Sequence, residues 1–364
     1  MSIKFHTPDT RPGRVDRLPS LTEYLKKPAL TVPEHLTDQE YAALGKNARA
    51  DYDQARLAYL SGGLFLPTPY FNSAKRMLHD CFENNFADNT GHTGVMLSGH
   101  GTVGKTTITK QLAKWVYNDY RRSFPEFEAD NRVPVVFIEV PAASTGKSLM
   151  VEFAEFLGLT YKPSDTMTGL RNRVTDMLNR IGTQLVIVDE LHNLSRKNVA
   201  TGETVQILKE LHDDLPATFL YAGINLTTEG ELLSGSTGRQ LAGRFSVLEM
   251  RNFALSTPQD VNVWMGVVDA FERKLCLRHQ EPGSLVEEWQ YLCDRTNGNI
   301  SSLSKLLTGE AIRAIRNPAR TTERLDQAAF VQRTLDHAAE TARASRTALR
   351  NSPRRTLNLK KGLT

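Results

Sequence analysis

Short runs of consecutive apolar residues alternate with longer stretches of helical periodicity between about residue 64 and residue 253. Continuous apolar runs separated by helical stretches are typical of a parallel sheet that helices cover on both faces. The pattern therefore predicts an α/β fold with a five-stranded parallel sheet. The strand candidates are residues 93–98, 133–140, 184–188, 217–222 and 245–250.

The chain on either side of this core has a different pattern. Residues 1–37 are rich in proline, threonine and charge without a sustained period, so we expect them to be extended or disordered. From Ser256 onward only helical periodicity is found, and Thr257 is expected to cap a helix that has Pro258 at its first position. The other predicted helices cover residues 38–60, 72–86, 107–117, 284–295, 300–315 and 322–338.

These patterns divide the 364 residues into four expected parts. An N-terminal extension of an extended segment plus a helix covers residues 1–60, and the sheet-containing core covers residues 61–253. A small all-α domain covers residues 254–338, and a disordered tail covers residues 339–364.

Charge is distributed unevenly over these parts. The formal net charge is +4, yet the chain after Glu340 holds seven basic residues and no acidic one. The body is therefore near neutral and the tail is a basic arm. Basic arms often contact nucleic acid, but a solvated tail without a function has the same composition.

Composition excludes several classes of protein. Hydrophobic residues make up 40% and charged residues 24% of the chain, as in ordinary globular proteins. There is no run of about 18 apolar residues and no apolar signal region, so we expect neither a membrane span nor secretion, and a cytoplasmic location. The three cysteines, Cys81, Cys276 and Cys293, lack metal or redox spacing, which predicts reduced thiols.

The segment between the first predicted strand and the next helix fits the phosphate-binding pattern G-x-x-x-x-G-K-[ST]. Its glycines allow backbone N–H groups to turn inward, and the helix N-terminus adds partial positive charge. Lys105 is expected to reach the β- and γ-phosphates, and the Thr106 hydroxyl to bind Mg²⁺. The predicted nucleotide-binding residues are Gly99, His100, Gly101, Thr102, Val103, Gly104, Lys105, Thr106 and Thr107.

An acidic pair follows the third predicted strand, in the segment LVIVDELHNL. Asp189 is expected to hold Mg²⁺, and Glu190 to orient and polarise the water that attacks the γ-phosphate. Such a pair at the end of a buried strand is the expected partner of a phosphate loop. The sequence therefore predicts a magnesium-dependent ATPase.

Two further catalytic positions are suggested by the later strands. Asn225 follows the fourth strand and is expected to contact the γ-phosphate or the attacking water, although a turn-forming asparagine is the alternative. An arginine just before the fifth strand is expected to reach the γ-phosphate of a neighbouring subunit. Arg244 is preferred and Arg239 is the second choice, with a structural surface role as the alternative for both.

These motifs together resemble the AAA+ ATPases, and more narrowly the TniB/TnsC type of transposition ATPase, relatives of MuB and IstB. The resemblance covers roughly residues 60–338. It is carried by segments that occur in one consistent order: LFLPTP, GHGTVGKTT, EVPAAST, VDELHNL, LYAGIN, GRQLAGRF and RTNGNISSLSKLL. It implies that the core is an AAA+ P-loop domain and that the all-α domain is its lid.

The resemblance also implies partners. Proteins of this type bind ATP, assemble as rings or filaments on double-stranded DNA without sequence preference, and recruit a transposase or integrase. Hydrolysis then disassembles the complex. Their DNA-contacting loop follows the second strand, which places Thr145 and Lys147 as candidates for contacts with DNA phosphates. Ser144 or Thr145 could equally cap the helix that begins near Ser148.

One position departs from the AAA+ pattern. AAA+ lids often carry an arginine in G-N-x-R, where this chain has Ser301, although Lys305 follows one turn later. This departure is compatible with a signalling or defence ATPase of the AAA+/STAND type that acts through protein partners without DNA. An initiator or helicase-loading AAA+ protein is a third alternative.

Overall fold

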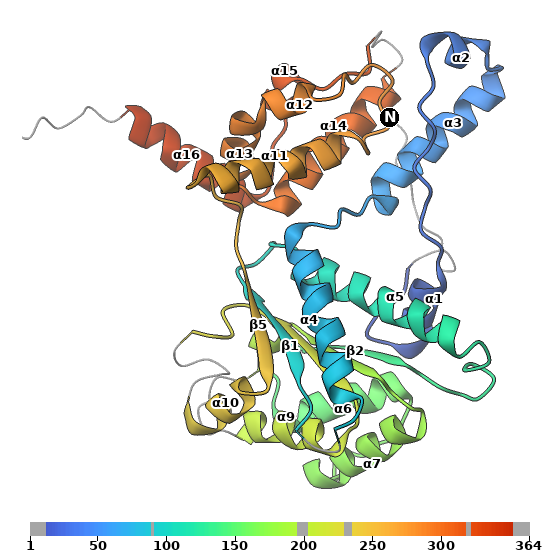
Figure 1. Cartoon of the computed structure of the whole chain (residues 1–364), viewed down its shortest axis with the longest axis vertical. Coiled ribbons are helices and arrows are strands. Elements are labelled where there is room, and N and C mark those ends of the chain that lie inside the picture. The colour runs from blue at the N-terminus through green and yellow to red at the C-terminus, as the bar shows by residue number, and fades with distance from the viewer. Residues whose placement is uncertain (1–11, 89–90, 195–202, 229–234, 318–321, 352–364) are drawn as a thin grey trace, which may run out of the picture. The chain divides into compact units, whose positions relative to one another are not determined.

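The computed structural model describes residues 12–88, 91–194, 203–228, 235–317 and 322–351, which form two compact units (Figure 1). The first unit contains Met1–Ala29 and Pro67–Arg251, and the second contains Leu30–Leu66 and Asn252–Thr364. The chain therefore passes from one unit to the other three times. No helix among the described residues has the length and apolar character that spanning a bilayer requires.

The first unit is built on a five-stranded sheet in the order β2-β3-β4-β1-β5, and every neighbouring pair is parallel. The predicted α/β fold with five parallel strands is thus confirmed. Strands β1 to β4 are almost wholly buried, which explains their uninterrupted apolar runs, whereas the edge strand β5 is partly exposed. The strands are β1 (Gly94–Gly99), β2 (Val135–Glu139), β3 (Leu185–Asp189), β4 (Thr218–Gly223) and β5 (Phe245–Met250).

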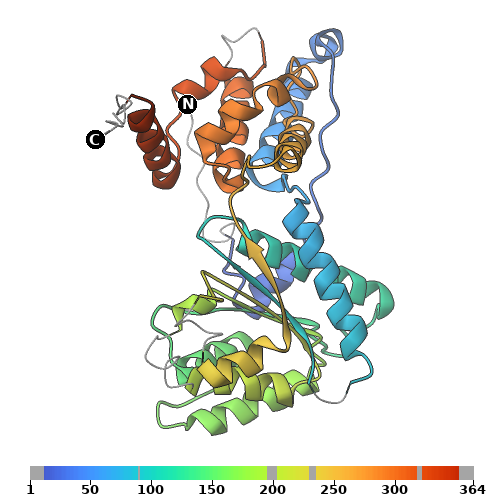
Figure 2. The same cartoon turned by 60° about the vertical axis from the view of Figure 1, so that its left-hand side comes forward.

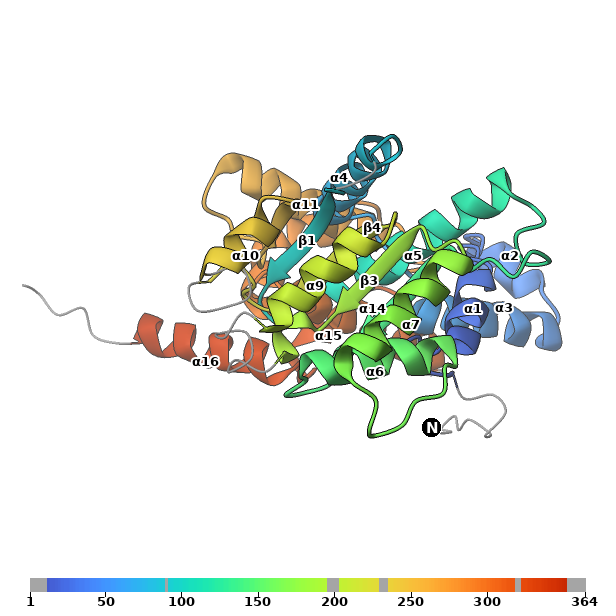
Figure 3. The same cartoon turned by 90° about the horizontal axis from the view of Figure 1, so that it is seen from below.

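Helices cover both faces of this sheet (Figures 2 and 3). Helices α4 (Pro69–Asn85) and α5 (Lys105–Ser123) pack on one face, α4 against β1, β4 and β5 and α5 against β1 to β4. The other face is covered by α6 (Gly146–Leu157), α7 (Met167–Arg180), α9 (Glu203–Asp214) and α10 (Gly235–Ala242). Because the strands are parallel, the carboxyl ends of β1, β3 and β4 all lie at the same end of the sheet.

The expectation that residues 1–37 are extended or disordered is wrong for part of this segment. Leu18–Lys26 form helix α1, which packs beside α5. Leu21 and Leu25 are buried four residues apart in the core of the first unit. Arg17 anchors the start of α1 through an ion pair with Glu155 of α6, 2.6 Å between Nη2 and Oε2. The proline-rich flanks obscured a helical period that spans only two turns.

The second unit is helical, as predicted for the region after residue 254. The predicted cap is present, because Thr257 and Asp260 form a capping box at the start of α11. The helices from the C-terminal part of the chain are α11 (Pro258–Glu272), α12 (Ser284–Glu287), α13 (Trp289–Thr296), α14 (Ile300–Arg316), α15 (Gln327–Val331) and α16 (His337–Asn351).

Residues 38–60 also belong to this unit, as α2 (Asp38–Ala43), α3 (Lys46–Ala58) and the π-helical turn Tyr59–Gly63. The single predicted helix is divided because Leu44 is extended, with ψ of 137°. Leu60 and Leu66 contribute to the same apolar cluster as Trp264 and Leu303. The segment expected as an N-terminal extension is therefore shared between both units.

The prediction of one helix over residues 322–338 is wrong. Helix α15 ends at Val331, and a new helix begins at His337 because Asp336 accepts a hydrogen bond from the Ala339 backbone N–H. Arg295 of α13 forms an ion pair with Glu340, which anchors the new helix. The first part of the predicted disordered tail is thus helical, and its basic residues Arg354, Arg355, Lys360 and Lys361 lie outside the described residues.

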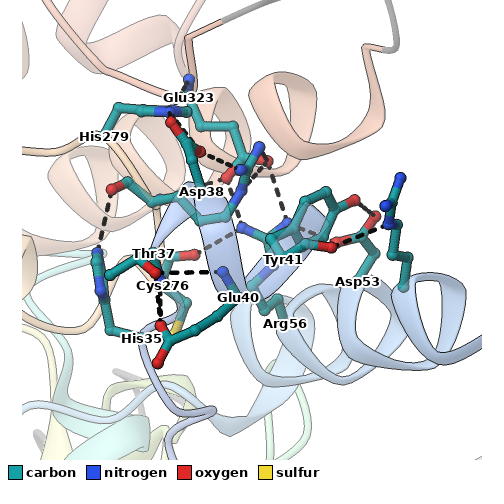
Figure 4. Close-up of polar contacts among 12 residues, drawn as sticks. His35, Thr37, Asp38, Glu40, Tyr41, Asp53, Arg56, Cys276, His279 and Glu323 are labelled. Carbon is teal, nitrogen blue, oxygen red and sulfur yellow. Dashed lines mark hydrogen bonds and ion pairs between the residues drawn. The ribbon is translucent and has the colours of Figure 1, made fainter. Parts of the chain in front are cut away.

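A buried ionic network connects α2 and α3 to the loops that follow α11 and precede α15 in the second unit (Figure 4). Arg56 of α3 is fully buried, with Nη2 2.6 Å from Asp53 and Nη1 2.5 Å from Glu323. Glu323 also binds Arg278, and Arg278 pairs in turn with Asp38. The network therefore connects residues that are more than 250 positions apart in the chain.

Candidate nucleotide-binding site

The loop that joins β1 to α5 has the conformation of a tight phosphate-binding turn. Gly99 has φ of 156°, and a Cβ there would lie 2.1 Å from the Met250 carbonyl oxygen of β5, so no other residue fits. Thr102 and Gly104 both have left-handed backbones, with φ of 66° and 96°. The loop then enters α5, whose N-terminal N–H groups carry partial positive charge. The predicted glycine loop is therefore followed by a helix N-terminus, as anion binding requires.

Lys105 is held inside this loop. Its side chain is 7% exposed, and its Nζ donates hydrogen bonds to the carbonyl oxygens of Gly99 at 2.8 Å and His100 at 2.6 Å. Burial lowers the pKa of Lys105, while the nearby carboxylates of Glu190 and Asp189 act in the opposite direction. A bound phosphate group would offer the Lys105 ammonium group a full negative charge, whereas the two carbonyl oxygens offer only partial charges.

The acidic pair lies beside the loop at the end of β3. Asp189 is 2% exposed, and it accepts hydrogen bonds from the Thr106 hydroxyl and, at 2.8 Å, from the Glu190 backbone N–H. Burial raises the pKa of Asp189, and these two hydrogen bonds oppose the rise. A hydroxyl and a carboxylate brought together in this way are oxygen donors of the kind that Mg²⁺ prefers, so the residues fit that ion.

Glu190 has a left-handed backbone, with φ of 57° and ψ of 34°, which is uncommon outside glycine. Its Oε2 lies 3.3 Å from Nδ1 of His192. Such a strained conformation persists only where its surroundings fix it, and functional residues are often held in this way. The site therefore contains two carboxylates that are adjacent in the chain. Asp189 is buried against Thr106, and Glu190 is half-buried.

Asn225 follows β4, the strand that lies between β3 and β1. It lines a polar cavity of about 560 Å³ together with Gly99, His100 and Glu249. Asn225 also has a left-handed backbone, with φ of 50°. The structure therefore brings Asn225, which was expected to contact the γ-phosphate or the attacking water, to the same cavity as the beginning of the phosphate loop.

Arg244 and Arg239 are the candidate finger arginines, the two arginines expected to reach the γ-phosphate of a neighbouring subunit. They lie just before β5, at the amino-terminal end of the sheet, opposite the phosphate loop. The Arg244 carbonyl oxygen accepts a hydrogen bond from the Gly94 N–H at the start of β1, whereas the phosphate loop follows the end of that strand. Six residues of strand span about 20 Å, which is too far for an arginine to contact a nucleotide in its own subunit. The Arg244 guanidinium forms an ion pair with Asp213 of α9, and Arg239 of α10 is exposed.

Thr145 and Lys147 lie at the start of α6. The Thr145 hydroxyl accepts a hydrogen bond from the Ser148 N–H in a capping box, so the cap expected at Ser144 or Thr145 is present and belongs to Thr145. Lys147 is half-buried in the first turn of the helix, and its Nζ donates a hydrogen bond to the Pro163 carbonyl oxygen at 2.7 Å. Ser301 lies in the first turn of α14, where Asn299 caps the helix, and Lys305 is exposed on the same helix.

Two residues near the site carried no expectation from the sequence. His192 and Asn193 lie two and three residues after Glu190; His192 contacts Glu190 and Asn193 contacts the loop after β2. In the sequence, the polar residues His192 and Asn193 after the acidic pair in VDELHNL were the feature that could have indicated further site residues. The contact of Asn193 could not be inferred from the sequence because its partner Val140 lies 53 residues away along the chain.

The comparison with known families agrees with this arrangement. The sequence matches the family described as "Bacterial TniB protein" over residues 56–255. The chain belongs to the TniB family. Its match begins within α3 and ends just after β5, so it includes the phosphate loop, the acidic pair and both candidate finger arginines.

Solved structures show that this TniB chain has the AAA+ fold. The Aeropyrum pernix ORC2 protein in ADPNP–ADP complexes is 14% identical, with a TM-score of 0.52 over 79% of this chain and 71% of that one. The Aeropyrum pernix ORC1 protein in complex with DNA is also 14% identical, with a TM-score of 0.51 over 80% of this chain and 69% of that one. No curated protein matches the sequence.

Proposed function

We propose that this TniB protein is an ATP-hydrolysing, DNA-binding regulator of transposition. In the ATP state it would assemble as a ring or filament on double-stranded DNA and recruit a transposase, and hydrolysis would disassemble it. The ATPase part of the proposal is supported by one observation: Lys105, Thr106, Asp189 and Glu190 lie together at the carboxyl ends of the strands.

Each residue has a separate role in this proposal. Lys105 and the loop N–H groups bind the β- and γ-phosphates, and Thr106 and Asp189 would hold Mg²⁺. When bound, Mg²⁺ neutralises part of the phosphate charge. Glu190 orients the attacking water and accepts its proton, and the Asn225 amide helps to position that water or the γ-phosphate. Expulsion of solvent by the bound nucleotide would strengthen these contacts.

The DNA part of the proposal depends on Lys147 at the N-terminus of α6. The Lys147 side chain is half-buried, and its ammonium group donates to a neutral carbonyl oxygen, which a phosphate would readily outcompete. A helix N-terminus favours anions in addition, although Thr145 already uses its hydroxyl as the cap. Contacts of this kind go to the DNA backbone, so they would carry no sequence preference.

Duplex DNA of random sequence is expected to bind in the presence of a non-hydrolysable ATP analogue and much more weakly with ADP. The slope of log affinity against log salt concentration should become shallower by about one in Lys147→Ala, because one phosphate contact is lost. Fluorescence anisotropy of a labelled duplex measures both effects. Lys46→Ala is the control, because Lys46 is an exposed lysine that also lies in the first turn of a helix, α3.

Failure of the wild-type protein to bind duplex at low salt would contradict the DNA part of the proposal. Assembly with the ATP analogue in the absence of DNA would then favour the signalling alternative. A slope unchanged in Lys147→Ala, with duplex still bound, would place the DNA contact elsewhere on the chain.

Arg244 lies at the amino-terminal end of the sheet, away from the phosphate loop of its own subunit. This position supports a contact with the nucleotide of a neighbouring subunit. Arg244→Ala is expected to lower ATP turnover by about 10³-fold or more, the scale of an arginine finger. Mixing it with Lys105→Ala should restore part of the activity, because the Lys105→Ala subunit donates a finger to an intact phosphate loop. Arg239→Ala in the same assay separates the two arginines. Equal activity of mixed and unmixed Arg244→Ala would argue for a role within the subunit.

A further inference from the structure

Two loops at the end of the sheet are joined by one side chain. The first loop follows β2 and runs from Val140 to Thr145, and the second follows β3 and carries Glu190. Asn193 donates a hydrogen bond from Nδ2 to the Val140 carbonyl oxygen at 2.9 Å. Its own carbonyl oxygen accepts a hydrogen bond from the Ser144 N–H at 3.1 Å.

The same residue is also bonded to Glu190. The Asn193 N–H donates to the Glu190 carbonyl oxygen at 2.8 Å, which closes the short helical turn between them. Asn193 therefore uses its backbone N–H, its backbone carbonyl and its side-chain amide to hold both loops at once. The neighbouring positions Leu194 and Ser144 form a parallel bridge, so the contact extends over more than one residue.

Both joined loops contain a non-glycine residue in the left-handed region. These residues are Glu190, with φ of 57°, and Ala143, with φ of 56°. Such conformations are sparsely populated and persist where surrounding contacts determine them. Because Asn193 bonds to Ser144, the residue after Ala143, and to Glu190 itself, a displacement of one loop changes the constraint on the other.

We propose that Asn193 is a positioning residue that couples the Val140–Thr145 loop to Glu190, so that duplex DNA bound at the start of α6 raises the rate of ATP hydrolysis. This inference rests on the proposed function, since it needs both hydrolysis by Glu190 and DNA contacts near Lys147. The loop leads directly into the first turn of α6, where Thr145 is the cap. A shift of that turn upon DNA binding therefore reaches Asn193 through Ser144.

The test compares ATP turnover with and without random-sequence duplex DNA. We expect duplex to raise wild-type turnover by about 5- to 150-fold, the typical size of the coupling between two linked sites. Asn193→Asp removes the Nδ2 donor with little change of shape, and it should bring this ratio to about 1 while duplex affinity with the ATP analogue stays unchanged. Asn179→Asp on α7 is the matched control, because its Nδ2 donates only weakly, at 3.5 Å, to the Asp214 carbonyl oxygen.

Hydrogen–deuterium exchange of the wild-type protein provides a readout that does not depend on the folding of a variant. Duplex should change the exchange of peptides containing residues 140–147 and 190–194 together. In Asn193→Asp, only the first peptide should respond. A wild-type ratio retained in Asn193→Asp, or a response of residues 140–147 alone in the wild type, would overturn the coupling.

Other outcomes separate this inference from the proposed function. A wild-type protein that hydrolyses ATP and binds duplex, but whose turnover ignores the duplex, overturns the coupling and leaves the proposed function standing. A wild-type protein that lacks either hydrolysis or duplex binding overturns both.

Discussion

Replacing Glu190 with glutamine is expected to lower ATP turnover by about 10²- to 10⁴-fold, the usual contribution of a general base. The amide keeps the size of the side chain but cannot accept a proton from water. Nucleotide binding should be retained, because Lys105, Thr106 and Asp189 are unchanged and Glu190 contributes only its backbone N–H to Asp189. Phosphate release measures turnover, and titration with a fluorescent ATP analogue measures binding.

The matched control for this variant is Glu83→Gln, because Glu83 is an exposed residue of α4. Its turnover should equal that of the wild type. The Glu190→Gln protein should also remain in the ATP-bound assembly, which light scattering or size-exclusion chromatography with ATP would detect. Turnover within about twofold of the wild type would assign the attacking water to another residue.

Replacing Glu323 with glutamine is expected to destabilise the second unit by about 3 kcal/mol. Arg56 is fully buried, and the change leaves its charge with Asp53 as the remaining acidic partner. Arg278 loses an ionic partner at the same time. In contrast, Asp269→Asn breaks an exposed ion pair with Arg273 on α11 and should cost about 0.3–0.5 kcal/mol.

Tryptophan fluorescence during urea unfolding measures this difference. Trp264 and Trp289 belong to the second unit, so a Trp115→Phe background makes the signal specific for it. Burial raises the pKa of Glu323, but hydrogen bonds and charge from Arg56 outweigh it, and the net pKa is lowered. The stabilisation is therefore present above the unfolded pKa of about 4.3 and is lost as pH falls below it.

The difference between wild type and Glu323→Gln should accordingly narrow when unfolding is measured at pH values below about 4. A destabilisation no larger than that of Asp269→Asn would show that the buried network contributes little. A difference that is independent of pH would point to packing instead of the charge of Glu323.

The sequence predicted the sheet well because buried parallel strands leave long apolar runs. It also located the tight glycine turn between β1 and α5, since glycine spacing reflects a local backbone requirement at Gly99 and Gly104. It failed where structure depends on distant partners. Helix α1 has only two buried leucines, and the break at Asp336 depends on a cap and on Arg295 of α13.

The ionic network and the domain boundaries show the same limit. Arg56 resembles any charged residue on a polar helix until Glu323 is placed beside it, 267 residues later. For the same reason, a continuous segment from residue 1 to residue 60 was expected where the structure divides the chain at Ala29 and Leu66. Local periodicity contains no information about which compact unit a helix joins.

The three passages of the chain between the units have a consequence for synthesis on the ribosome. Arg56 is made 267 residues before Glu323, and at about 5–20 residues per second this interval is roughly 13–53 s. During that time α3 has emerged without its buried counter-charge, while the whole Pro67–Arg251 segment is produced. All segments of the nucleotide-binding unit are therefore made before the helical unit, whose first segment is Leu30–Leu66, can close.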